Sequence, residues 1–432
     1  MAHWRAWLLV SAVSMGGFVG VASAASEVDI LLNKLVEKGI LTSEDAGQIR
    51  REVAAEAKAE QNPQVAKETL PDSSRNWKWG GDIRLRHESR NRTGTGTDVN
   101  RERIRFRYGF EAKVADDLKV GARLATGSTA DPISTNQTFN TAFNHKTIVL
   151  DRAFVEYSPQ VPGISKTKLT GGIIENPFWG VGQLVWDDDL NFDGAAAHLE
   201  KEIGPAMLFT NNGLFSIQTD ITEAVALWAT QGGVILKPFP GSEDELLKNF
   251  KLTGALAYYD YQNLTRGLSK QTVTGITNAV TSAGGFKGNS NAGGLFLAQD
   301  FNLLNPTIEV TSQYATIPFG FFGDWVHNTA VTSAGNGFQI GLKLGKASVP
   351  FDLKKGWEAG YYYEQLAPDA TFGAFTDSDF GNSGTNHNGH VYWVKLATLK
   401  NSNFQFKYFN THENRGSKNN ADTIQMDWVT KF

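Results

Sequence analysis

From residue 77 to the end of the chain, apolar and polar side chains alternate with a period of two, which predicts β-strands with two different faces. In residues 103–114 every second position is apolar, from Ile104 to Val114, and the positions between them are charged apart from Gly109. Strands of soluble sandwiches usually have about five or six residues, whereas a strand that crosses a membrane in a barrel needs about 9–11. The length of this run favours a transmembrane barrel.

The same pattern predicts sixteen strands, and the connections between them alternate between longer and shorter ones. This alternation is typical of outer-membrane barrels, which have short periplasmic turns and longer external loops. An even number of strands places both ends of the barrel segment on the periplasmic side. The predicted strands are 77–89, 102–114, 118–127, 147–157, 168–175, 190–200, 205–211, 224–237, 250–262, 292–301, 306–315, 337–346, 355–366, 388–399, 402–412 and 421–432.

The last predicted strand ends the chain on an aromatic residue, Phe432, which shares a face with Met426 and Trp428. This arrangement is similar to the assembly signal of Gram-negative outer-membrane proteins. An aromatic girdle is also expected near the periplasmic rim. Its predicted members are Trp77, Trp79 and Trp428.

The segment before the barrel has three predicted parts. Residues 1–24 are typical of a signal peptide, because Arg5 precedes an apolar run that ends in the small residues Ala22-Ser23-Ala24. Residues 25–60 carry a helical apolar period and form a leader, which either pairs with copies of itself, docks in the periplasm or stays a solvated helical hairpin. Residues 61–76 form a linker to the barrel at 77–432.

Composition narrows the choice of function. The net charge of −4 gives no reason to expect a nucleic-acid partner, and the absence of cysteine excludes thiolate metal sites and cysteine nucleophiles. After the N-terminal segment no apolar run is long enough for a spanning helix, so strands must carry any membrane crossing. The sequence shows no strong catalytic motif, and we expect no enzyme, no cofactor and no metal site.

Several segments resemble the putative porin family of Gram-negative outer-membrane β-barrels, whose members carry a short helical leader after the signal. The resemblance is carried by the leader at 31–42, by 79–86 with the strand that follows, and by 150–157 and 191–194. It covers nearly the whole mature chain. It implies a pore in the outer membrane, and likeness to general porins implies a trimer. It implies no site residues.

In such a barrel the apolar face meets lipid and the other face lines a wet lumen. Arginine gathers where carboxylates or other anions are bound. The predicted lumen wall is thus either a positive surface that attracts anionic solutes, or a set of cross-strand salt bridges with Asp82, Glu88, Glu111 and Glu156. An excess of positive side chains favours some unpaired charge. The arginines are Arg84, Arg86, Arg103, Arg105, Arg107, Arg123 and Arg152.

The third long connection, 176–189, is too apolar for a freely solvated loop and ends in Asp187, Asp188 and Asp189. In well-known porins the third loop folds inward and its acids face an arginine cluster. We therefore expect these aspartates to line the pore opposite the arginines. Two alternatives are calcium bound by the aspartate run and packing of the loop against a neighbouring subunit.

The predicted function is an outer-membrane porin, a water-filled channel for passive diffusion of small hydrophilic solutes, with an anion preference set by the arginines. Its expected partners are these solutes, outer-membrane lipid and further copies of the chain. One alternative is a structural tether whose leader binds periplasmic or cell-wall partners. A barrel enzyme is the weakest alternative.

Overall fold

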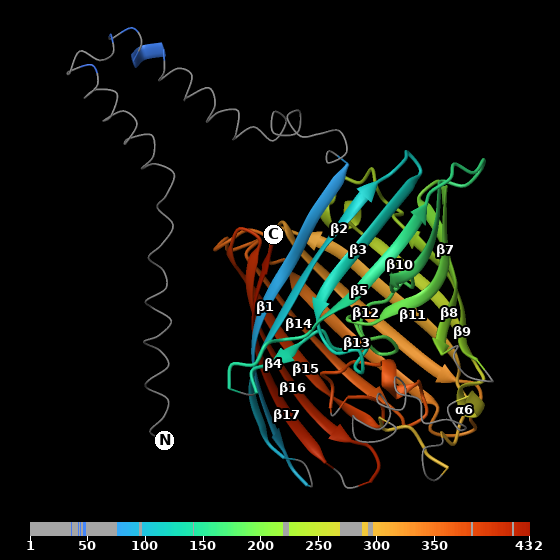
Figure 1. Ribbon diagram of the computed structural model, residues 1–432. Coiled ribbons are helices and arrows are strands. Elements are labelled where there is room, and N and C mark those ends of the chain that lie inside the picture. Colours follow the sequence, from blue (N-terminus) through green and yellow to red (C-terminus); the bar gives the residue numbers. More distant parts are fainter. Residues whose placement is uncertain are drawn as a thin grey trace. The chain divides into compact units, whose positions relative to one another are not determined.

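The computed structural model describes residues 76–432 except 95–96, 141, 219–223, 268–286, 293–296, 382 and 417–418, together with 36, 42, 44 and 46–48. The predicted signal peptide 1–24, nearly all of the leader 25–60 and the linker up to residue 75 therefore lie outside the described residues. The chain divides at Trp77 into two units, of which the second, 77–432, is a barrel (Figure 1). Within the described residues no helix has the length and apolarity needed to cross a membrane.

Sixteen antiparallel strands form a closed ring, as the sequence predicted. Each strand pairs with its neighbours in chain order, and β17 pairs with β1 to close the ring. A further strand of two residues, β4 (Gln137–Thr138), pairs with β2 inside a connection. The ring consists of β1 (Trp77–Arg92), β2 (Val99–Lys113), β3 (Leu118–Thr126), β5 (Ile148–Tyr157), β6 (Lys166–Glu175), β7 (Asn191–Ile203), β8 (Ala206–Gln218), β9 (Val225–Leu236), β10 (Lys251–Gln262), β11 (Asn302–Tyr314), β12 (Ile317–Asn328), β13 (Asn336–Gly345), β14 (Trp357–Leu366), β15 (His387–Leu399), β16 (Ser402–Glu413) and β17 (Asn420–Lys431).

Short helical turns occur only in connections among the described residues of the barrel. These are α5 (Glu245–Lys248), α6 (Leu264–Gly267) and the 3-10 turn η1 (Gly373–Phe375). The α5 turn is capped by Asp244, whose side chain accepts a hydrogen bond from the N–H of Leu247. It lies in the connection 237–250, at the same end of the barrel as the start of β1 and the end of β17.

One predicted strand was wrong and one real strand was missed. Residues 297–301 contain no strand, and β11 begins only at Asn302, while β12 occupies residues that the sequence pattern left in a connection. The alternation in β12 is hidden because Gly320 and Gly323 interrupt it. Its inward-facing Phe322 and Val326 are also apolar, since they pack against loops inside the barrel. The two errors offset each other, so the strand number was still correct.

The ring closes through the C-terminal residue. The N–H of Gly81 donates to the carbonyl of Phe432 at 2.9 Å, and the N–H of Phe432 donates back at 3.1 Å. The Phe432 ring stacks on Tyr108, with 6.1 Å between the ring centroids. The terminal aromatic residue therefore lies at the seam between β1 and β17.

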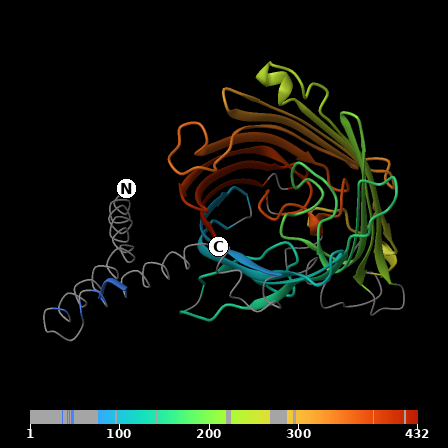
Figure 2. The same ribbon diagram turned by 90° about the horizontal axis from the view of Figure 1, so that it is seen from above.

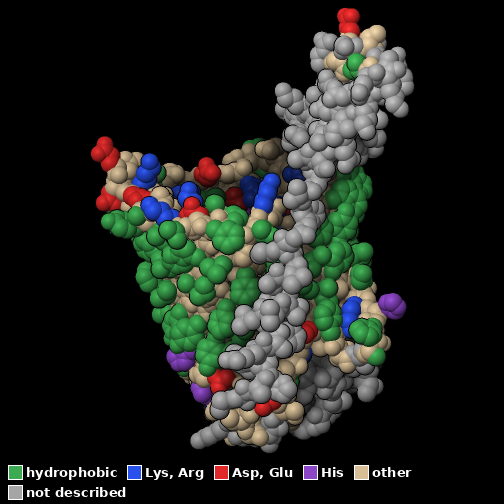
Figure 3. Space-filling model, turned by 90° about the vertical axis from the view of Figure 1, so that its left-hand side faces the viewer, with side chains coloured by type: hydrophobic (Ala, Val, Ile, Leu, Met, Phe, Trp, Pro, Cys, Tyr) green, Lys and Arg blue, Asp and Glu red, His purple; other side chains and the backbone are tan. Residues whose placement is uncertain are grey.

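On the side that Figure 3 shows, the outer surface of the barrel carries a band of hydrophobic side chains. Large apolar residues of the strands are exposed: Leu85, Ile308 and Ile340 are each at least half exposed, and Trp428 is 47% exposed. Burial in lipid explains such exposure, because the apolar side chains of a soluble protein rarely form so large a patch. The alternation along each strand therefore sorts apolar side chains outward and polar ones inward.

Glycines on the inner wall make room for aromatic rings of neighbouring strands. A Cβ atom on Gly233 would collide with the ring of Phe209, and one on Gly360 would collide with the ring of Trp393. Neither glycine has a positive φ. These positions therefore need glycine for space, and they account for part of its high content, 44 residues.

Candidate functional site

Two long connections fold into the barrel and pack on each other. Figure 2 shows the connection 176–190, in green, and the connection 367–386, in orange, inside the ring of strands. The N–H of Asp187 donates to the carbonyl of Phe375 at 2.8 Å, and the N–H of Ser378 donates to the carboxylate of Asp187 at 2.7 Å. The two connections thus form one unit within the lumen.

The connection 176–190 is docked on the barrel wall by hydrogen bonds. The amide of Gln231 on β9 accepts from the N–H of Trp179 and donates to its carbonyl, each at 2.8 Å, and it is fully buried. Further along, Gly182 lies against the side chain of Gln339 on β13, so close that a Cβ would collide with it. The connection therefore reaches from one wall toward another.

The apolar residues of this connection build a core inside the barrel. Leu184, Val185 and Trp186 are all at most 7% exposed. The Trp186 ring packs edge-on against Phe192 at 5.0 Å and Tyr259 at 5.1 Å between centroids. Residues of 367–386 and 297–301 join the same cluster. The apolar character noted in the sequence thus serves packing on the strands that follow β6.

Arg86 joins the wall to the second inward connection. Its guanidinium donates two hydrogen bonds to Asp427 on β17, at 2.7 and 2.9 Å, and a third to Asp379 at 2.9 Å. All three side chains are largely buried, and bidentate pairs of this kind fix geometry as well as charge. Arg86 therefore holds the connection 367–386 against β1 and β17.

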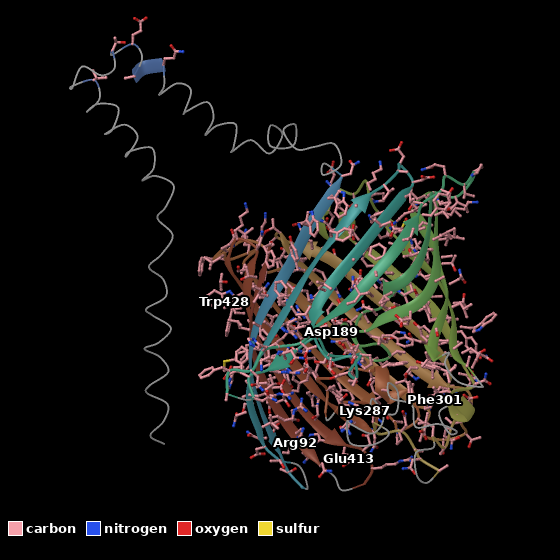
Figure 4. The ribbon with its side chains drawn as sticks, viewed as in Figure 1. Arg92, Asp189, Lys287, Phe301, Glu413 and Trp428 are labelled. Carbon is pink, nitrogen blue, oxygen red and sulfur yellow. The ribbon has the colours of Figure 1, made fainter. Side chains whose placement is uncertain are left out.

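Arg105 and Arg107 share two carboxylates. Both lie within 3 Å of Asp82 on the same wall, and within 3.6–3.8 Å of Asp189 from the connection 176–190. Asp189 also accepts hydrogen bonds from the N–H and hydroxyl of Thr135. Asp189 is therefore in direct contact with the arginine wall, whereas the sequence led us to expect the aspartates opposite the arginines across the pore. Figure 4 shows Asp189 within the barrel, between its two ends.

The other predicted arginines also have carboxylate partners, with one exception. Arg103 lies 3.6 Å from Glu88, Arg123 pairs with Asp151, and Arg152 pairs with Glu175 at 3.0 Å. Arg84 has no carboxylate at salt-bridge distance among the described residues. It donates to the side chain of Asn136 at 2.6 Å, and its Nε atom is buried without a partner among the same residues.

The three aspartates of the connection 176–190 have different surroundings. Asp187 is 4% exposed, and burial raises its pKa well above the ordinary value, with Asp377 and Asp189 adding to the rise. Burial also opposes ionisation of Asp189, but Arg105 and Arg84 outweigh it and lower the pKa. Asp188 is exposed to the lumen. They therefore cannot act as a single group.

Several site residues were missed in the sequence. Asp427 and Arg101 follow from the alternation, because both lie on inward faces of strands. Arg101 precedes the predicted strand 102–114, since β2 begins at Val99. Arg101 pairs with Glu88 at 2.6 Å. Asp379 and Gln231 had no local signal, because their partners come from distant parts of the chain. The described residues contain no group of three or more metal-ligating side chains.

Two cavities lie on either side of the connection 176–190. The first, of about 570 Å³, is lined by that connection and by β11–β16, including Asp188, Phe322, Lys343, Trp393 and Lys407. The second, of about 460 Å³, faces β2–β9. Its charged lining residues are Glu111, Lys119, Arg152, Glu156, Lys166, Lys168, Glu175, His198 and Glu200.

The solved structures that are similar to this chain are barrels of outer-membrane porins. Pseudomonas putida OprB at high pH has a TM-score of 0.52 and 10% identity, and the match covers 90% of this chain and 97% of that chain. Salmonella typhi OmpF in complex with daunomycin has a TM-score of 0.47 and 11% identity, covering 84% and 99%. A Rh. blastica porin variant has a TM-score of 0.42 and 10% identity, covering 82% and 100%.

At 10% identity the likeness to OprB shows the fold alone. No sequence among the curated proteins matches the chain. The model of a family described as "Putative porin" matches residues 91–292 and 308–432, most of the chain. Family and fold point to a channel rather than an enzyme. The chain belongs to the putative porin family and is an outer-membrane porin.

Proposed function

We propose that this porin lets small hydrophilic solutes diffuse passively down their gradients and prefers anions. Barrels of about 16 strands are wide enough to enclose an aqueous channel, so no chemical step is needed. The observation that carries the anion preference is Arg84 on β1, which lies near Arg86 and Arg105 and has no carboxylate at salt-bridge distance in the described part of the chain.

Pairing limits how much of the arginine wall can act on solutes. Arg105 and Arg107 are neutralised by Asp82 and Asp189, so they stiffen the barrel and anchor a loop. An unpaired charge in a narrow passage with low-dielectric walls acts over a longer range than one in bulk water. Arg84 is therefore the residue expected to raise the local concentration of anions.

The test is the reversal potential of single channels in a planar bilayer under a KCl gradient. We expect the wild-type channel to favour chloride, Arg84→Gln to lose a large part of this preference, and Arg84→Lys to keep most of it. If Arg84→Gln keeps the wild-type reversal potential, Arg84 is not the determinant. A cation-selective wild type would refute the anion preference, and purified protein without conductance would refute passive diffusion.

We also propose that the porin assembles as a trimer, as its resemblance to general porins implies. Channel closure in three equal current steps and a matching mass in detergent are the expected results. A single closing step from a monomeric particle would contradict the proposal.

A further inference from the structure

The first cavity has a wall of aromatic rings from neighbouring strands. Phe322 on β12, Tyr362 on β14 and Trp393 on β15 line it, opposite the connection 176–190. Phe322 and Trp393 pack on the cluster that contains Tyr362 and Phe380, which comes from the connection 367–386. The cavity volume, about 570 Å³, is within the range of small-molecule sites, about 300–1,000 Å³.

The Trp393 indole lies flat against the barrel wall. A Cβ atom on Gly360 would collide with three adjoining atoms of the indole, Cζ2, Cη2 and Cε2, which is possible only if the ring covers the glycine with its face. The indole N–H donates to Glu358 at 3.1 Å and fixes this orientation. The opposite face of the ring is therefore held toward the lumen and is ready for stacking.

Positive charge lies beside this ring surface. The ammonium group of Lys407 is 4.5 Å from the centroid of the Phe409 ring and 6.0 Å from that of Tyr362. Neither Lys407 nor Lys343 has a carboxylate at salt-bridge distance among the described residues, whereas Lys395 pairs with Glu358 at 3.3 Å. Asp188 faces the same cavity and is exposed. Asp187 and Asp324 also line the cavity without a cation at salt-bridge distance among the described residues, but both are buried and accept hydrogen bonds, Asp187 from Ser378 and Asp324 from Asn305 and Thr307. Among the charged lining groups that are neither buried nor paired, the two lysines therefore outnumber Asp188.

We propose that this cavity is a binding site for small aromatic carboxylates, with the ligand ring on Trp393 and Phe322 and its carboxylate at Lys407. A ring on aromatic faces gains apolar burial and stacking, and a carboxylate gains a charge-assisted contact with the ammonium group. The inference rests on the proposed channel function and deepens it by naming a solute class. It differs from the anion preference in requiring the ring as well as the charge.

The test uses potassium benzoate with single channels in KCl. We expect benzoate, added to each side in turn, to interrupt the current of the wild-type channel in a concentration-dependent way. Acetate lacks the ring and benzyl alcohol lacks the charge, so both should interrupt the current at least about tenfold more weakly. Glucose, a neutral sugar, is tested in the same way. If glucose interrupts the current and benzoate does not, the proposal is overturned.

Lys407→Gln should weaken the benzoate effect at least about tenfold, and Lys407→Arg should retain it. The matched control is Lys119→Gln, because Lys119 also lies over an aromatic ring, that of Phe154 at 5.6 Å, but in the second cavity. This control should change the effect less than about twofold. If the wild-type channel conducts but benzoate does not interrupt its current, the binding site is refuted and the channel function is not. If the protein does not conduct at all, the channel function itself is refuted.

Discussion

Single residues influence how the two inward connections respond to pH, and Asp377 is one of them. Burial raises its pKa to about 6, and Asp379 adds to the rise while Lys407 opposes it. Its Oδ2 atom is buried and lacks a hydrogen-bond partner among the described residues, as suits a protonated acid. In the unfolded chain an aspartic acid has a pKa of about 3.9. The packed loop therefore binds the proton more tightly.

The sign of the pH effect follows from this difference. The contribution of Asp377 to packing is greatest below about pH 4 and is lost as the pH rises to about 6, because the packed state then has to release a proton that it holds tightly. Hydrogen exchange of the amides at 375–380, corrected for intrinsic rates, should be at least about tenfold slower at pH 4 than at pH 7. Asp377→Asn should reduce this difference, and an undiminished difference in the variant would contradict the assignment.

Gly360 offers a second test at the scale of one residue. Gly360→Ala adds a methyl group that collides with the Trp393 ring, and overpacking of this kind typically costs about 1–3 kcal/mol. The midpoint of thermal unfolding in detergent, read from the mobility shift on gels, should fall. Gly232→Ala is the matched control, since nothing lies within 4 Å of its added Cβ. Equal losses in both variants would show that backbone freedom, not ring packing, decides the result.

At the scale of elements, the strands could be predicted where one face meets lipid and the other meets water. Ile104, Phe106 and Tyr108 made β2 visible for this reason, and the same rule placed the seven arginines on the inner face. It failed at β12, where Gly320 and Gly323 interrupt the alternation and where inward Phe322 and Val326 pack on clusters that include loop residues. Alternation along a strand arises only where its two faces meet different surroundings. Where the inward face is also apolar, the alternation disappears and the strand cannot be recognised from the sequence.

The inward connections could be predicted only in part. The apolar run that ends at Trp186 indicated burial. The aspartates were expected opposite the arginines across the pore, but Asp189 contacts Arg105 and Arg107 directly. The sequence could not show that Asp187 joins another connection, because its contact with Ser378 spans the fold from β6 to β15. Such contacts depend on where several long connections meet, and no local pattern encodes them.

Gln231 gives a prediction for the connection 176–190 as an element. Its amide makes two hydrogen bonds with the backbone of Trp179 and accepts one from Asn211. Gln231→Leu leaves these buried groups without partners, at a cost of about 1–3 kcal/mol each. We expect faster hydrogen exchange in 176–190 and a noisier single-channel current. Gln365→Leu, at an exposed position of β14, should leave both unchanged. If the Gln231→Leu channel shows neither faster hydrogen exchange in 176–190 nor a noisier current, the anchoring role of Gln231 is contradicted.

For the whole molecule, the bore is set by both inward connections together, since each one is tied to a different part of the wall. Gln231 on β9 holds 176–190, and Arg86 on β1 holds 367–386 through Asp379. The N–H and the carboxylate of Asp187 join the two connections by hydrogen bonds to Phe375 and from Ser378. Releasing either tie should therefore change the conductance of the same passage. A porin in which only the third external loop narrows the lumen would not behave in this way.

Asp379→Asn separates these two cases. It weakens the attraction between 367–386 and Arg86 while leaving the paired hydrogen bonds of Arg86 to Asp427 in place. We expect a larger mean conductance and more frequent current fluctuations in planar bilayers. Asp427→Asn is the matched control, because it alters the same guanidinium within the wall and leaves the loop contact intact. If Asp427→Asn changes the conductance as much as Asp379→Asn does, the effect comes from the charge of Arg86, and the connection 367–386 does not set the bore.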